Sequence, residues 1–216
     1  NTIIRNNNST VNGGGVFLAG SITKAFVGCT IEGNTGVEGG GVAYAMAGDQ
    51  NTFLDCSFVG NIATSRGGGI AVLGTASAGI VDVERCLFEM NRAENAGGAI
   101  WISDQDVFHA INSVFVGNTA ANDGGVVRNE QIFEAVHCTF VDNGVDAEGV
   151  SDSFRSELSD ADTKLLNCIV VNDSANSHDG SGDLSASYTL LPEGPGGAAD
   201  GNGNFNADPM FVDPAG

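Results

Sequence analysis

The sequence predicts an all-β protein: a right-handed parallel β-helix (a solenoid) of about six coils of about 27 residues, with a C-terminal cap. Two recurring marks and one absence predict this fold. An asparagine returns every 25 to 30 residues, at Asn7, Asn34, Asn61, Asn91, Asn118 and Asn143. Glycines followed by a β-branched residue keep the same interval, ending at Val16, Val42, Ile70, Ile100, Val126 and Val150. No segment carries a helical stripe of about ten residues or more.

Each repeat contains a short strand that ends at the asparagine, as in residues 86–91 (CLFEMN). Apolar residues stand at the cysteine, two positions before it and two positions after it, as in Val27, Cys29 and Ile31. Because side chains alternate between the two faces of a strand, this period of two predicts that all three face the interior.

The cysteines share one position of the repeat, which predicts a single interior column. They are Cys29, Cys56, Cys86, Cys138 and Cys168, and Ser113 stands in the same series. We expect small buried thiols at these positions. Stacked Cα atoms about 4.8 Å apart also permit one disulfide in an oxidising exterior, with Cys29–Cys56 or Cys56–Cys86 as the natural pair.

The asparagines have two interpretations, a polar row in an active site or a structural ladder. We expect a ladder at Asn34, Asn61, Asn91, Asn118 and Asn143, in which stacked amides bond one another and the backbone of the turn. The glycines are expected to be structural as well, because they allow positive φ angles and close contact between coils.

Two further short apolar runs follow the glycines in most repeats, as in residues 100–102 and 80–83. The unit is therefore two or three short strands with no helix. A propeller blade needs four strands in about 40 residues and fits less well. Six coils at the usual strand spacing give a rod of roughly 30 Å.

The repeat weakens after about residue 146 and is no longer recognisable after residue 172, where we divide the chain into two parts of one domain. Residues 1–172 are assigned to the β-helix repeats, and residues 173–216 to an irregular capping segment that covers the end of the solenoid. Residues 151–163 (SDSFRSELSDADT) are expected to form a protruding loop. Residue 1 falls inside a repeat, which indicates a piece of a longer or processed chain.

The tail contains the one candidate metal site, with oxygen-bearing side chains at alternate positions as in the start of a calcium loop. These residues are Asp200, Asn202, Asn204 and Asp208. Phe205 stands where an EF-hand has its glycine, and the distal glutamate is missing. A polar cap without a metal is the favoured interpretation, so no cofactor is expected and calcium is the alternative.

The chain carries 27 acidic and 8 basic residues, a formal net charge of −19. Such a chain repels phosphate backbones and anionic membrane surfaces, so we expect neither nucleic acid nor a membrane as a partner. No apolar run reaches about 18 residues, so we also expect no membrane insertion.

The phrase Phe-x-x-Asn, as in Phe88 to Asn91, alternates with glycine phrases such as residues 97–100 (GGAI). Together they resemble the repeats of chlamydial polymorphic outer-membrane proteins and of other secreted bacterial right-handed β-helix proteins. The resemblance covers residues 1 to about 172, and the tail resembles the closing stretch of surface-anchored bacterial β-helix proteins. It implies a passenger displayed at the cell surface or outside the cell, for adhesion or as a surface layer.

Enzymatic signatures are weak in this sequence. Parallel β-helices host polysaccharide lyases and glycosidases, which need clustered carboxylates or a basic residue beside them. The basic residues are scattered along the chain, and no common catalytic motif is present. We therefore expect a non-catalytic adhesin, surface-layer or fibre-forming module that associates with itself or with a cell-surface glycan or protein. The alternative is a carbohydrate-active enzyme or a glycan-binding module.

Overall fold

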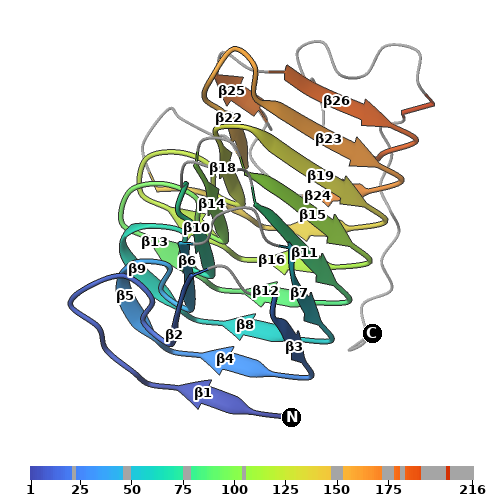
Figure 1. Cartoon of the computed structure of the whole chain (residues 1–216). Coiled ribbons are helices and arrows are strands. Elements are labelled where there is room, and N and C mark those ends of the chain that lie inside the picture. The colour runs from blue at the N-terminus through green and yellow to red at the C-terminus, as the bar shows by residue number, and fades with distance from the viewer. Residues whose placement is uncertain are drawn as a thin grey trace, which may run out of the picture.

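The computed structural model describes residues 1–20, 23–45, 50–74, 79–103, 106–146, 153–171, 178–180, 183–190 and 203–204, with only the backbone considered at 178–180. It confirms the predicted all-β solenoid (Figure 1). Every strand pair among these residues is parallel and joins one coil to the next.

Four parallel sheets form the walls of the solenoid, where the sequence predicted two or three strands per coil. Sheet A contains β1 (Ile3–Arg5), β4 (Thr30–Glu32), β8 (Ser57–Val59), β12 (Leu87–Glu89), β16 (Val114–Val116), β20 (Thr139–Val141) and β24 (Ile169–Val171). Sheet B contains β5 (Thr35–Glu38), β9 (Ile62–Arg66), β13 (Arg92–Ala93), β17 (Thr119–Ala120) and β21 (Gly144–Val145). It was missed because its strands are short and rich in polar residues.

The other two walls follow the glycines. Sheet C contains β2 (Val16–Ala19), β6 (Val42–Ala45), β10 (Ile70–Val72), β14 (Ile100–Ile102), β18 (Val127–Asn129), β22 (Phe154–Ser156) and β25 (His178–Gly180). Sheet D contains β3 (Ala25–Val27), β7 (Gln50–Leu54), β11 (Ile80–Glu84), β15 (Val107–Ile111), β19 (Ile132–Val136), β23 (Asp162–Leu166) and β26 (Asp183–Ser187).

Residues in the left-handed region turn the chain between walls. Between sheets D and A, the residue before the cysteine position has φ between 49° and 61° in successive coils: Gly28, Asp55, Arg85, Asn112, His137, Asn167 and Tyr188. The residue before the asparagine turns the chain out of sheet A, and the first glycine of each pair turns it into sheet C. At Gly97, with φ of 68°, a Cβ atom would lie 2.3 Å from the Ile100 carbonyl oxygen, so glycine is required.

The turn between sheets D and A contradicts the prediction that the residue two positions before the cysteine faces inward. A left-handed residue between two strands breaks the alternation of side chains. Val27 is therefore 53% exposed and Leu166 40% exposed. The inward residues stand one position earlier, as Phe53 and Leu165 do.

The core is a column of stacked residues enclosed by the walls. Phe58 and Phe88 stack with ring centroids 4.5 Å apart, Phe88 and Phe115 at 4.7 Å, and Phe115 and Phe140 at 4.9 Å. All four rings are fully buried. Burying each ring contributes about 2 to 3 kcal/mol, so this stack is a main source of cohesion between coils.

Residues 151–163 do not form the predicted protruding loop as a whole. Phe154 lies in β22, is fully buried and packs edge-on against Phe140 at 5.0 Å. Ser156 also faces inward, and its hydroxyl lies 2.9 Å from that of Thr163. The sequence did not indicate this strand, because Phe154 is its only apolar residue. Its inward positions are Phe154 and Ser156.

The predicted irregular cap also contains regular structure. Strands β25 and β26 extend sheets C and D by one strand each, and Leu190 forms a parallel bridge with Ile169. Ala186 and Leu190 are buried. A partial seventh coil therefore lies inside segment 173–216, while residues 191–202 and 205–216 lie outside the described part.

Candidate functional site

The asparagines form a continuous buried ladder through the corner after sheet A. The Asn61 backbone N–H and side-chain Nδ2 both donate to Asn91 Oδ1, at 3.1 and 2.9 Å. Asn91 repeats this pattern onto Asn118, and its Nδ2 also donates to the Phe58 carbonyl at 2.9 Å. The ladder continues through Asn34 to Asn7 at one end and to Asn143 at the other. These amides are occupied within the ladder, which leaves them with a structural role.

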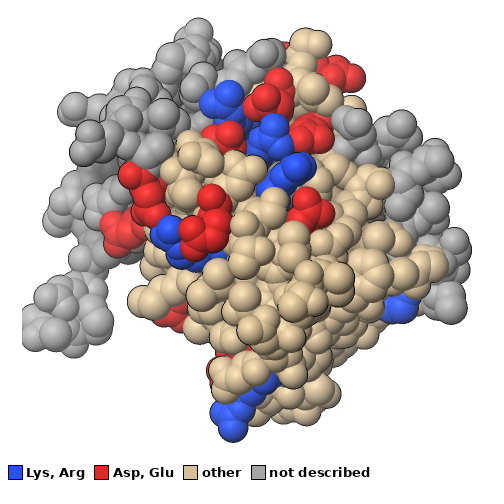
Figure 2. Space-filling view, turned by 90° about the vertical axis from the view of Figure 1, so that its left-hand side faces the viewer, with Lys and Arg blue, Asp and Glu red and all other residues tan. Residues whose placement is uncertain are grey.

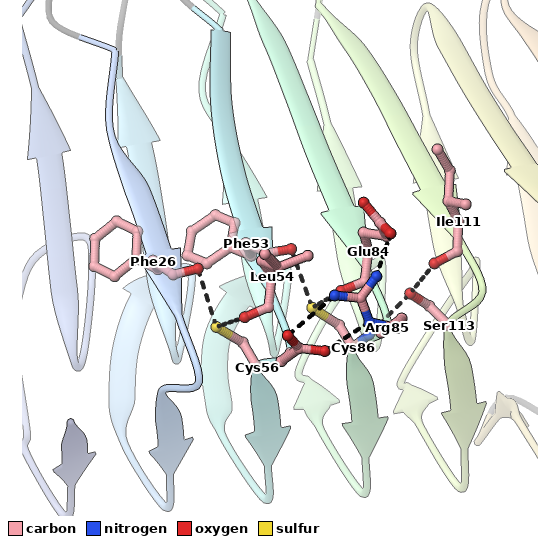
Figure 3. A network of polar contacts seen from close by, with 10 residues as sticks. Phe26, Phe53, Leu54, Cys56, Glu84, Arg85, Cys86, Ile111 and Ser113 are labelled. Atoms are coloured by element: carbon pink, nitrogen blue, oxygen red, sulfur yellow. Dashed lines mark hydrogen bonds and ion pairs between the residues drawn. The ribbon is translucent and has the colours of Figure 1, made fainter. Parts of the chain in front are cut away.

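The cysteines form a second buried column, at the corner between sheets D and A. All five are free thiols and each is at most 8% exposed. Cys56 Sγ donates to the Leu54 carbonyl at 3.3 Å, and Cys86 Sγ donates to the Phe53 carbonyl at 3.3 Å (Figure 3). Ser113 takes the same place with its hydroxyl, which donates to the Ile111 carbonyl at 2.9 Å and accepts the Cys86 N–H at 3.1 Å.

One part of this column has a polar rim. Arg85 donates to both carboxylate oxygens of Asp55, from Nε at 2.8 Å and from Nη2 at 3.1 Å, and it also contacts Glu84. A hollow of about 330 Å³ is lined by residues that include Asp55, Cys56, Arg85 and Cys86. The Arg85 hydrogen bond lowers the pKa of Asp55, and the same pairing raises the pKa of Arg85.

The two thiols at this hollow differ in acidity because they share a hydrogen bond. That bond lowers the pKa of Cys56 to about 6. The pKa of Cys86 is raised by the same bond and by burial. Cys56 is therefore the better candidate for a thiolate.

A separate cluster of charges lies on the outward side of sheet C. Arg128 and Arg155 lie next to each other in register, and Nε of each is within 4 Å of the Asp123 carboxylate. The Arg66 guanidinium lies over the Trp101 ring, 4.5 Å from its centroid. Burial raises the pKa of Asp123, although the neighbouring arginines oppose this effect.

Basic and acidic side chains are interleaved on the face drawn in Figure 2, and they gather over its upper half. The cluster around Asp123 also includes Glu130 and Glu157, which pair with Arg128 at 2.6 and 3.6 Å. Because the arginines are paired with carboxylates, they do not form a free basic patch.

The outward face of sheet D carries a third arrangement, a row of charges along successive strands. His109 Nδ1 lies 2.8 Å from Asp82 Oδ1, and His109 Nε2 lies 3.8 Å from Glu134. Lys164 donates to Glu134 at 3.0 Å. Beside this row runs the exposed aliphatic position described above, which includes Val27, Ile111 and Leu166.

Of the four calcium candidates, Asp200, Asn202 and Asp208 lie outside the described residues. Asn204 is described, and both ends of its amide have partners. Its Oδ1 accepts the Thr189 N–H at 3.0 Å, and its Nδ2 donates to the Ala186 carbonyl at 2.7 Å. Because Thr189 Oγ1 itself accepts the Cys168 N–H, Asn204 continues the cysteine column. Within the described ranges, no group of three or more potential metal-binding side chains occurs.

Sequence reasoning missed the Asp55–Arg85 pair and the Asp123 cluster. The first could have been found from the repeat itself, because Asp55 and Arg85 occupy equivalent positions one coil apart. The second depends on a side-by-side placement of Arg128 and Arg155, which required β22 to be identified first.

Comparison with known proteins gives one family match, and it falls on a single repeat. Residues 55–72 match the model of the Chlamydia polymorphic membrane protein repeat. This segment runs from Asp55 through β8, β9 and the glycine turn into β10. No curated protein and no solved structure gives a significant match. In the part of the chain that the structure describes, no helix has the length and apolar character to cross a bilayer. The chain is therefore a β-solenoid protein, and its segment at residues 55–72 is similar to the Chlamydia polymorphic membrane protein repeat.

Proposed function

We propose that this chain is a non-catalytic β-helix module displayed at the cell surface or outside the cell, where it acts as an adhesin. The observation that supports the proposal is that the repeating side chains serve to hold neighbouring coils together. The asparagine amides and the aromatic rings are all directed into the stack between coils. Recognition is thereby left to outward faces, which differ from coil to coil.

The outward face of sheet D is the best suited of these faces. Several of its strands are five residues long, including β11, β15, β19 and β23. The row formed by Asp82, His109, Glu134 and Lys164 gives it alternating acidic and basic side chains. Ile111 is 37% exposed beside that row. Aliphatic contacts bordered by ion pairs favour a protein partner over a glycan.

A binding assay with matched variants tests this proposal. Beads coated with the chain are added to cells, and bound beads are counted before and after the cells are treated with protease or glycosidase. Ile111→Asp should abolish binding, whereas Ile62→Asp, at a 39% exposed isoleucine of sheet B, should not. Circular dichroism checks that both variants are folded.

Three results would contradict an adhesin that uses sheet D to bind a protein. Equal binding by both variants would exclude this face. Loss of binding after glycosidase alone would assign a glycan partner. Sedimentation showing a multimer that Ile111→Asp dissolves, without binding to cells, would assign a surface-layer or fibre-forming role through self-association.

A second candidate is a carbohydrate-active enzyme or glycan-binding module, and Asp123 is the observation that favours it. Its pKa is raised and it lies beside two arginines, as an acid catalyst or sugar-binding carboxylate would. Incubation with a panel of neutral and acidic polysaccharides, followed by an assay for new reducing ends, tests it. Activity that Asp123→Asn removes would overturn the non-catalytic proposal.

A further inference from the structure

Six strands of sheet D form a block of equal length along the rod (Figure 1). Strands β7, β11, β15, β19, β23 and β26 contain five residues each and pair in register, so each strand position forms a row. The second and fourth rows face the core. The first, third and fifth rows therefore make up the outward face, and its centre lies between β15 and β19.

The third row carries acidic and basic side chains in strict alternation. In chain order its four central members are Asp82, His109, Glu134 and Lys164. Read in the opposite direction, the same row is base, acid, base, acid. If a second copy lies against this face with its rod reversed and its centre aligned, Asp82 faces Lys164 and His109 faces Glu134. Every acidic side chain of one copy then meets a basic side chain of the other.

We propose that the partner of this face is a second copy of the chain, bound face to face with the two rods antiparallel. The inference rests on the proposed adhesin role of sheet D and names the partner. The twofold axis lies in the interface, along the strand direction between β15 and β19, so each row faces itself in reverse. The same patch thereby serves both copies, as in most symmetric dimers.

The rows on either side of the charged row are apolar at the axis. In the fifth row Ile111 faces Val136, and in the first row Val107 faces Ile132. Ile111 is 37% exposed and the other three are half-buried. The axis is thus surrounded by aliphatic contacts, whereas the pairs of Asp82 with Lys164 lie toward the edges. This is the usual division of an interface into an apolar centre and a polar rim.

The outer strands of the block also match in size. A hollow of about 240 Å³ lies over β19, β23 and β26, and Ser185 and Ser187 line it on the β26 side. The axis places β7 of the second copy over β26. Thr52 and Leu54 of the second copy therefore face these serines, so that larger side chains meet the hollow.

The charged row also selects against the other alignments of two copies. With the rods parallel, Asp82 would face Asp82 and Glu134 would face Glu134. An antiparallel copy displaced by one strand would place Asp82 opposite Glu134, or His109 opposite Lys164. Like charges opposite each other are destabilising, so these alignments are disfavoured. The net charge of −19 adds a general repulsion, which leaves the local matching as the source of specificity.

The size of the face predicts a weak dimer. At about 4.8 Å between strands and 3.3 Å per residue, the block measures roughly 24 by 16 Å, or about 400 Å² for each copy. This is at the low end for specific interfaces, so single pairs should form transiently. Many copies on each of two surfaces would hold more firmly through avidity. Rods that project from facing surfaces point in opposite directions, as the antiparallel arrangement requires.

Reversal of one charge at a time tests the arrangement, with sedimentation velocity of the full chain over a range of concentrations at low salt. Asp82→Lys places two lysines opposite each other, and Lys164→Glu places two carboxylates opposite each other. We expect each variant alone to dimerise roughly tenfold more weakly, or worse. An equimolar mixture of the two variants should dimerise again, because the new lysine of one faces the new glutamate of the other.

The controls separate this contact from net charge and from folding. Glu89→Lys, on β12 of sheet A, changes the net charge as Asp82→Lys does and should not weaken the dimer. Net charge alone would make Asp82→Lys associate more strongly, because the chain becomes less acidic. Positions 82 and 164 are three strands apart, about 14 Å, so contacts within one copy do not explain recovery in the mixture. Circular dichroism checks that every variant is folded.

The outcomes distinguish this inference from the adhesin role. A chain that stays monomeric, or a mixture that dimerises no better than its two variants, would overturn the second copy as the partner. If such a monomer still binds cells that lack the chain, and Ile111→Asp abolishes that binding, the adhesin role stands with another partner. Beads coated with the unaltered chain should cluster with one another. Dimers that follow the charge reversal without any clustering of beads would keep the second copy and reject the adhesin role.

Discussion

Removal of one rung from the asparagine ladder should lower the stability of the protein by several kcal/mol. In Asn91→Ala, the Asn61 backbone N–H loses its acceptor and the Phe58 carbonyl loses its Nδ2 donor. The bond to Asn118 Oδ1 and the one from Asn61 Nδ2 are also removed. All these groups lie in fully buried residues. Each buried group left without a partner costs about 1 to 3 kcal/mol, so two such groups give a loss of about 2 to 6 kcal/mol.

Urea unfolding followed by far-UV circular dichroism measures this loss. The matched control is Asn122→Ala, because Asn122 also donates to another asparagine one coil away, Asn95 Oδ1, at 2.9 Å, but at an exposed site. Its expected cost is within about 0.5 kcal/mol. If Asn91→Ala and Asn122→Ala have the same midpoint and slope, the ladder does not stabilise the fold and the reasoning fails.

Three further predictions concern a turn, a charge and a metal. Gly97→Ala should unfold in less urea than Gly60→Asn, because a Cβ at position 97 meets the Ile100 carbonyl at 2.3 Å, whereas position 60 is open and has the turn that Met90 adopts; equal midpoints would contradict this. The hydrogen bond from Arg155 lowers the pKa of Glu157 below its usual 4.5. The folding stability that this pair contributes is therefore present in full above pH 4.5 and is lost as the pH falls through the lowered pKa. Glu157→Gln should therefore melt earlier than the unaltered chain at neutral pH and together with it in acid. EDTA should leave the melting temperature unchanged, because the Asn204 amide is already bonded to Thr189 and Ala186; a fall reversed by calcium would establish the metal site.

The period, the glycine turns and the inward aromatic residues could be predicted from the sequence because each rests on a repeated residue type. The first turn could not, because its left-handed residue changes from coil to coil. Gly28 is the residue type most typical of such a turn, whereas Arg85 and Tyr188 are types that rarely adopt it. Because that turn was not recognised, the alternation of side chains was extended across the corner. Val27 and Leu166 were therefore predicted to face the interior, although they are exposed.

The candidate site was predicted in part for a related reason. The cysteine column follows from sequence positions alone, and the structure adds that the Asp55–Arg85 pair lies beside two of its members, Cys56 and Cys86. Arg85 is adjacent to Cys86 in sequence, yet its partner Asp55 lies one full coil away. A pattern within one repeat cannot show contacts between repeats unless it is known which residue of one coil pairs with which residue of the next.

The coils differ in length, and the difference is greatest at one connection. The step from the start of sheet D to the asparagine is the same in successive coils, as from Ile80 to Asn91 and from Val107 to Asn118. The step from sheet C to sheet D ranges from Val127–Ile132 to Ile70–Ile80. Insertions at that connection leave the stacked rings and amides in place. New sequence can therefore accumulate along one edge of the rod, and a lineage could alter what that edge presents without rebuilding the molecule.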